Sequence, residues 1–153
     1  MISANNETIC FIWRKKILNN YIKSNNLRST PERFKILELI HDMNNHFTIQ
    51  ELFNHINKKN NVSKATLYNN IKIFVECKLL IKHQFSNKEY LYEKNNFKNH
   101  YHLICKCGKI TEFSNPRIIS LLSGIKKSIK GVNINSFSLN FYGECESCPE
   151  LNK

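Results

Sequence analysis

Apolar positions recur at helical spacing through the first half of the chain and predict four helices. The first spans residues 9–24. The second begins at Thr30, which can cap it, and the others begin after Thr48 and Ser63, which are also good caps. The predicted inward-facing residues are Ile9, Ile12, Trp13, Ile17, Tyr21 and Ile22, then Phe34, Leu37 and Ile40, then Ile49, Leu52, Phe53 and Ile56, and finally Leu67, Ile71, Phe74 and Val75.

After the fourth helix the residue pattern changes from helical to strand-like, which predicts a β-hairpin over residues 79–93 with its turn at residues 86–88. Several helices followed by a hairpin is the order of a winged-helix domain. We therefore expect a winged-helix DNA-binding domain over residues 1–93. Helix 63–77 would enter the major groove, and the hairpin would be the wing.

The second half of the chain alternates strand-like and helical patterns. Residues 94–99 lack apolar periodicity and are expected to form a hinge. The following elements are strands at 102–105, 109–113 and 137–143 and a helix at 116–130, with a tight turn at Gly108. The expected fold class is α+β, with a small α/β dimerisation and metal-binding domain over residues 100–153. A unit this small buries little surface, so metal binding and dimerisation are expected to stabilise it.

The net charge adds an expected partner. The chain of 153 residues carries a formal charge of +11 with a pI near 9.5, which favours an anionic partner such as nucleic acid. With the winged-helix order, the expected partner is double-stranded DNA. The alternative is background lysine from an AT-rich genome. No apolar run is long enough to span a bilayer, and the N-terminus lacks the layout of a signal peptide. We expect a cytoplasmic protein that binds neither a membrane nor an organic substrate.

The fourth predicted helix has the residue types of a DNA-reading helix. Leu67 and Ile71 lie four residues apart on one face, so the polar side chains occupy the others. Lysines can contact phosphates, whereas a tyrosine ring and an asparagine amide can contact bases. The alternative is an ordinary amphipathic surface helix. The candidate DNA-binding residues here are Lys64, Thr66, Tyr68, Asn69 and Lys72.

Four of the six cysteines form two close pairs. They are Cys105 with Cys107 and Cys145 with Cys148, and they predict a structural zinc site of four thiolates. The alternatives are a degenerate site with one free thiol, a redox enzyme using the Cys-x-x-Cys pair, and a zinc-ribbon RNA-binding protein. A redox pair normally opens a helix, which the five residues after Cys148 are too few to form, so no enzyme is expected. Cys10 and Cys77 are expected in the core.

A pair of histidines predicts a second metal site. His100 and His102 project to the same face if they lie in a strand, because side chains alternate with period two. Two imidazoles on one face can chelate a divalent ion. Single histidines are more often surface residues, and we expect this of His41, His55 and His83.

Four motifs in order make the chain similar to the ferric uptake regulator family. They are residues 27–33 (LRSTPER), 63–69 (SKATLYN), 100–110 (HYHLICKCGKI) and 141–148 (FYGECESC), and the resemblance covers about residues 10–148. It implies a dimeric repressor that binds an inverted repeat when loaded with metal. It assigns minor-groove contact to Arg28 and major-groove contact to Tyr68 and Asn69.

The resemblance also implies the regulatory metal ligands. They are His46, Glu93, His100 and His102, with Glu112 as a fifth candidate. Nitrogen and oxygen ligands suit iron(II), manganese or zinc. Ligands from both halves would fix the relative orientation of the domains, and so couple metal binding to DNA binding. We expect an iron(II)-responsive repressor of metal-uptake genes, with peroxide-, zinc- and manganese-responsive regulators as alternatives.

The chain departs from the family pattern at several positions. Its first cysteine pair is Cys-Lys-Cys where the family has Cys-x-x-Cys, so its turn must be tighter. Phe137 and Tyr101 stand where some relatives have ligands of an additional metal site, which we expect to be absent. Leu91 stands where the peroxide-responsive branch has an aspartate, which favours the iron-responsive type. Asn69 replaces the arginine of many relatives and is similar to the peroxide-responsive branch.

Overall fold

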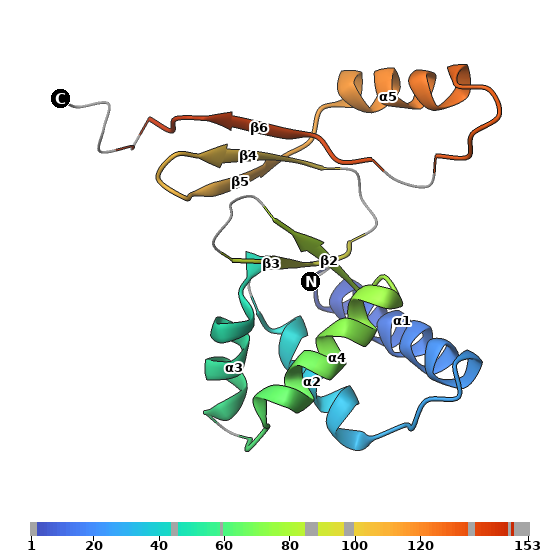
Figure 1. Cartoon of the computed structure of the whole chain (residues 1–153), viewed down its shortest axis with the longest axis vertical. Coiled ribbons are helices and arrows are strands. Elements are labelled where there is room, and N and C mark those ends of the chain that lie inside the picture. The colour runs from blue at the N-terminus through green and yellow to red at the C-terminus, as the bar shows by residue number, and fades with distance from the viewer. Residues whose placement is uncertain are drawn as a thin grey trace. The chain divides into compact units, whose positions relative to one another are not determined.

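A computed structural model describes residues 3–43, 46–58, 60–84, 89–96, 100–134, 137–146 and 148. The chain divides into two compact units, residues 1–96 and 97–153, and each is described by itself. The elements of both units are labelled in Figure 1. None of the helices in the described ranges combines the length and apolar character that a bilayer crossing requires.

Four helices form the frame of the first unit. They are α1 (Ser3–Ser24), α2 (Pro31–His41), α3 (Ile49–Asn57) and α4 (Lys64–Glu76). The predicted caps are confirmed: Thr30, Thr48 and Ser63 each accept a hydrogen bond from a backbone N–H three residues later. Helix α1 begins well before the predicted start.

The inward-facing stripe predicted for α1 was partly wrong. Ile12 and Trp13 are 60% and 43% exposed, whereas Leu18 and Ile22 are buried. Arg14 is also buried, and its guanidinium donates hydrogen bonds to the backbone oxygen of Asn95 and to Oδ1 of Asn96. The stripe was misplaced because a charged residue occupies one of the inward positions four residues from Leu18.

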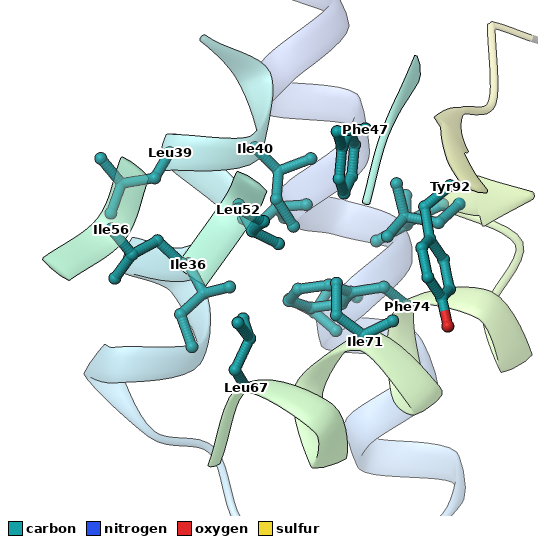
Figure 2. Packing of buried hydrophobic residues seen from close by; sticks show 14 of the residues in the cluster. Ile36, Leu39, Ile40, Phe47, Leu52, Ile56, Leu67, Ile71, Phe74 and Tyr92 are labelled. Carbon is teal, nitrogen blue, oxygen red and sulfur yellow. The ribbon is translucent and has the colours of Figure 1, made fainter. Parts of the chain in front are cut away.

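The core of the first unit lies between the helices and one sheet. Figure 2 shows side chains of α2, α3 and α4 pointing toward one another, with Phe47 and Tyr92 beside them. The rings of Phe47 and Tyr92 stack, with centroids 6.2 Å apart. Residues buried in this core are Leu18, Ile22, Ile36, Leu37, Leu39, Ile40, Phe47, Leu52, Ile56, Val62, Leu67, Ile71, Phe74, Cys77, Leu79, Leu80 and Tyr92.

The predicted hairpin is part of a three-stranded antiparallel sheet, which we call the wing sheet. Its strands are β1 (His46–Phe47), β2 (Leu80–His83) and β3 (Leu91–Lys94), in the order β1-β3-β2. The short strand β1 was not predicted. It pairs His46 with Glu93 and Phe47 with Tyr92. The predicted turn at residues 86–88 lies outside the described residues.

The first part of the predicted hinge is held to the first unit. Lys94 ends β3, and its ammonium group donates to the backbone oxygens of His41 and Met43. The backbone N–H of Asn95 donates to the backbone oxygen of Leu79, and its side-chain amide donates to the backbone oxygen of Lys78. Residues 97–99 lie outside the described residues.

The second unit is a small α/β structure. Strands β4 (Tyr101–Cys105), β5 (Ile110–Phe113) and β6 (Asn140–Gly143) form a sheet in the order β5-β4-β6, and α5 (Pro116–Ser128) joins β5 to β6. Strand β4 is antiparallel to β5 and parallel to β6. This order brings the chain just after β4 close to the chain just after β6.

Candidate functional site

The four paired cysteines meet at one end of the sheet in the second unit. Sγ of Cys107 lies 3.2 Å from Sγ of Cys105 and 3.8 Å from Sγ of Cys145, and Cys105 lies 3.8 Å from Cys148. All four sulfurs lie within 4.8 Å of one another. Four sulfurs at about 2.3 Å from a zinc ion would be about 3.8 Å apart in a regular tetrahedron. The cluster therefore has nearly the dimensions of a four-thiolate zinc site.

The backbone explains how the short Cys-Lys-Cys segment reaches this geometry. Cys105 ends β4, and its carbonyl accepts from the N–H of Gly108, which has a φ of +89°. A residue with a side chain rarely adopts this φ, so glycine allows the tight turn. On the other side, Cys105 pairs with Gly143 in the parallel ladder, which places Cys145 beside it. One spacer residue is therefore enough to bring both sulfurs of this pair together.

The thiols of the first cysteine pair differ in acidity. The backbone N–H of Cys107 is the main cause that lowers the pKa of the Cys105 thiol to about 6. The N–H of Cys145 also donates to Sγ of Cys105, over 3.1 Å. For Cys107, the Lys109 backbone lowers the pKa, but the neighbouring Cys105 sulfur and burial outweigh it and raise the pKa to about 11. Backbone donors that favour a thiolate are consistent with a metal-binding role for Cys105.

The other two cysteines are separate from this cluster. Cys77 is buried at the end of α4 and donates to the backbone oxygen of Phe74, as expected of a core thiol. Burial raises the pKa of the Cys77 thiol to about 11. Cys10 is half-buried on α1.

Part of the predicted regulatory ligand set lies on the sheet of the second unit. The rings of His100 and His102 are 5.0 Å apart between centroids and nearly perpendicular. His102 is buried and pairs directly with Glu112 across β4 and β5. Paired residues share a face of the sheet, so the carboxylate of Glu112 and the imidazole of His102 lie on the same face.

The remaining predicted ligands lie on the wing sheet of the first unit. His46 and Glu93 are direct cross-strand partners, and Nε2 of His46 lies 3.6 Å from Oε2 of Glu93. Glu93 is 1% exposed, which is rare for a carboxylate unless it is paired or binds a cation. His83, expected at the surface or in packing, also reaches this carboxylate: its Nε2 lies 2.8 Å from Oε2 of Glu93. The sequence missed this contact because His83 and Glu93 meet only through strand pairing.

The structure exposes four of the five candidate DNA-binding side chains of α4: Lys64, Tyr68, Asn69 and Lys72. Leu67, Asn70, Ile71 and Phe74 are buried, whereas Tyr68 is 55% exposed. Thr66 is half-buried and bonded to Ser63, while Lys64 contacts Gln50 and lies over the ring of Phe53. Lys64, Asn69, Lys72 and, before α2, Arg28 are exposed.

A groove of about 450 Å³ separates α4 from the wing. Its walls carry two lysines, the carboxylate of Glu76 and aromatic rings, and the ammonium group of Lys82 lies 3.5 Å from the ring centroid of Tyr90. This chemistry suits a phosphate backbone with neighbouring sugars and bases. The lining includes Tyr68, Asn69 and Lys72 from α4, and Lys82, Tyr90 and Tyr92 from the wing.

Comparison with known proteins agrees with the resemblance found in the sequence. Residues 24–142 match the family described as "Ferric uptake regulator family". The ferric uptake regulation protein of Yersinia pestis is 33% identical over 132 residues, which cover 84% of this chain and 88% of that protein. The peroxide-responsive repressor PerR of Staphylococcus epidermidis is 29% identical over 126 residues, which cover 81% of this chain and 83% of that protein.

Solved structures give the same fold. The Helicobacter pylori ferric uptake regulator Fur matches with a TM-score of 0.75 and 23% identity, over 90% of this chain and 93% of that one. The Francisella tularensis ferric uptake regulator, solved with iron, matches with a TM-score of 0.65 and 29% identity, over 80% of this chain and 94% of that one. The expected α+β fold, a helical region with wing strands followed by an α/β domain, is confirmed.

Proposed function

Because the chain belongs to the ferric uptake regulator family, we propose that it is an iron(II)-responsive repressor that binds an inverted-repeat operator as a dimer. The membership itself makes it a metal-dependent transcriptional regulator and not an enzyme. It also removes the zinc-ribbon RNA-binding protein and the dithiol redox enzyme as alternatives. Proteins of this family bind DNA as dimers.

The observation that carries the proposal is the distribution of the ligand types. Candidate nitrogen and oxygen ligands occur in both units: His46 and Glu93 on the wing sheet, and His100, His102 and Glu112 on and beside the other sheet. We propose that one divalent ion takes its ligands from both sets. Such an ion would hold the DNA-reading helix and the second unit in one relative orientation, and so raise operator affinity.

The cysteine cluster has a different proposed role. Four thiolates form a closed shell that favours zinc and leaves no position for a reacting ligand. All four belong to the second unit, where the ion would join the end of β4 to the chain after β6. We propose a structural zinc ion at this site and a regulatory ion at the histidine and carboxylate site.

Iron(II) is the proposed regulatory metal, with a peroxide-responsive regulator as the second candidate. Two observations favour iron: Glu93 is buried beside His46, and apolar Leu91 stands where the peroxide-responsive branch has an aspartate. The relatives include both ferric uptake regulation proteins and peroxide-responsive repressors. Asn69 is the feature of the chain most similar to the peroxide-responsive branch.

DNA binding is proposed to use the exposed face of α4. Tyr68 and Asn69 would contact base edges, and Lys64 and Lys72 would contact phosphates, with Thr66 beside them. Arg28 is proposed to reach the minor groove. The groove between α4 and the wing adds Lys82 and Tyr90 to this surface.

The test is anaerobic footprinting on an operator selected from random DNA, with iron(II), manganese(II) and zinc(II) added in turn to zinc-loaded protein. Protection is expected with iron(II) at the lowest concentration. The double variant His100→Ala/His102→Ala should lose the metal response and stay dimeric. A response equal to wild type in this variant contradicts the regulatory site. Oxygen added to His46 or His100 after peroxide, seen by peptide mass spectrometry together with release of DNA, favours the peroxide-responsive alternative.

A further inference from the structure

The two faces of the wing sheet carry different chemistry. Direct strand pairing joins Phe47 to Tyr92 and Tyr92 to Lys82, so these side chains share one face. Because side chains alternate along a strand, Glu93 belongs to the other face, together with its partner His46. His83 follows Lys82 in β2 and lies on that same second face. The first face packs on the core and lines the groove beside α4, whereas the second gathers ionisable groups.

Both histidines of the second face have their Nε2 atoms nearest to the same oxygen of the Glu93 carboxylate. Oε2 of Glu93 lies 2.8 Å from Nε2 of His83 and 3.6 Å from Nε2 of His46. The first distance is that of a charge-assisted hydrogen bond, and the second is too long for one. The side chains of His83 and Glu93 are only 12% and 1% exposed, so water does not compete freely for this bond. His83 therefore holds one oxygen of the carboxylate at its imidazole.

We infer that His83 is a positioning residue for the regulatory metal site: it orients the Glu93 carboxylate through its Nε2–H group. This inference rests on the proposed function, in which Glu93 is a ligand. Carboxylates that bind metals are usually hydrogen-bonded in turn, and loss of such a partner typically weakens metal binding about 10- to 100-fold. His83 acts through Glu93 and is not itself counted among the ligands.

The position of His83 in the fold gives the hydrogen bond a second consequence. His83 follows Lys82 directly in β2, and Lys82 lies in the groove beside Tyr68 on the opposite face of the same strand. The His83–Glu93 bond therefore ties the wing strand that carries Lys82 to a proposed metal ligand. Binding of metal at Glu93 would then restrain the wing directly, in addition to orienting the two units.

The test compares three variants of the zinc-loaded full chain, with manganese(II) as an air-stable probe whose free form is measured by electron paramagnetic resonance. His83→Ala should bind manganese(II) about 10- to 100-fold more weakly than wild type. His83→Gln, whose amide can replace the Nε2–H donor, should recover part of the loss. His55→Ala, on α3 and not on the wing sheet, is the matched control and should bind as wild type does.

A second measurement needs no regulatory metal. In zinc-loaded protein without added manganese, the ¹⁵N signal of Nε2 of His83 should shift when Glu93 is replaced in Glu93→Gln, whereas the signals of His55 should not. An unchanged His83 signal contradicts the hydrogen bond and the inference.

The outcomes separate the inference from the proposed function. If Glu93→Ala abolishes manganese binding but His83→Ala keeps wild-type affinity, the positioning role is wrong and the proposed regulatory site stands. If His83→Ala and His83→Gln bind manganese(II) equally weakly, His83 does not act through a donated hydrogen bond. If wild type binds no ion beyond the structural zinc, the proposed function and the inference both fail.

Discussion

Nε of Arg33 donates a hydrogen bond of 2.8 Å to Oδ1 of Asn70, which joins the first turn of α2 to the middle of α4. The amide of Asn70 donates in turn to the backbone oxygen of Thr66, over 2.8 Å. Asn70 is buried on the face of α4 opposite the exposed Tyr68. This polar link therefore fixes how the proposed DNA-reading helix is rotated against α2.

We expect Asn70→Ala to destabilise the protein by about 1–3 kcal/mol, because Nε of the half-buried Arg33 loses the acceptor that the buried Asn70 supplies. Operator affinity should also fall, although Asn70 does not face the DNA. Urea denaturation and operator titration measure the two effects. Asn69→Ala is the matched control, since its exposed side chain should change the free energy of unfolding by less than about 0.5 kcal/mol while still weakening operator binding. Equal stability of the two variants contradicts the proposed role of Asn70.

Tyr68→Ala is expected to weaken binding to the operator more than binding to random DNA. Its ring is exposed on α4 and lines the groove beside the wing, where it can contact bases. Lys72→Ala should instead weaken both kinds of DNA and reduce the slope of log affinity against log salt by about 1, as expected for one phosphate contact. Fluorescence anisotropy with operator and random DNA at several salt concentrations distinguishes the effects of the two variants. An equal loss on both DNAs for Tyr68→Ala would make it a positioning residue only.

The cysteine cluster predicts about one zinc ion per chain that resists mild chelation. Cys107→Ser should lose this ion and lower the thermal stability of the second unit, because three remaining thiolates leave the shell open. Cys10→Ser is the control, since Cys10 lies on α1 and not in the cluster. Zinc content by elemental analysis, together with thermal unfolding, measures both. Tightly held zinc in Cys107→Ser would show that the Cys-Lys-Cys turn leaves Cys107 as a free thiol.

Local signals in the sequence predicted much of this fold. Thr30, Thr48 and Ser63 cap helices as expected, because capping depends on residues three positions apart. The close cysteine spacing likewise predicted a cluster that the structure assembles. What the sequence could not give is pairing between distant segments. The two-residue strand β1 shows no periodicity of its own.

Two ionisable residues show the same limit. His83 was assigned to the surface because its contact with Glu93 exists only when β2 and β3 pair. Arg14 was not recognised as buried because its partners are Asn95 and Asn96, some eighty positions along the chain. A rule that places ionisable side chains at the surface fails at sites where the fold itself supplies their polar partners.

The proposed dimer predicts that apolar side chains exposed on the second unit are covered by a second copy of this chain. Leu121 and Ile125 are 65% and 44% exposed and lie four residues apart on α5, hence on one face of it. Phe141 and Tyr142 on β6 are exposed as well. Exposed apolar residues that gather in one small unit mark an association surface more often than scattered ones do.

We therefore expect Leu121→Lys/Ile125→Lys to shift the protein from dimer to monomer in sedimentation velocity. Operator affinity should fall steeply, because a monomer can bind only one half of an inverted repeat. Ile12→Lys is the matched control: Ile12 is 60% exposed on α1 of the first unit, so its replacement should leave the dimer intact. If the double variant remains dimeric and still binds zinc, the dimer uses another surface, and the exposed face of α5 has no part in it.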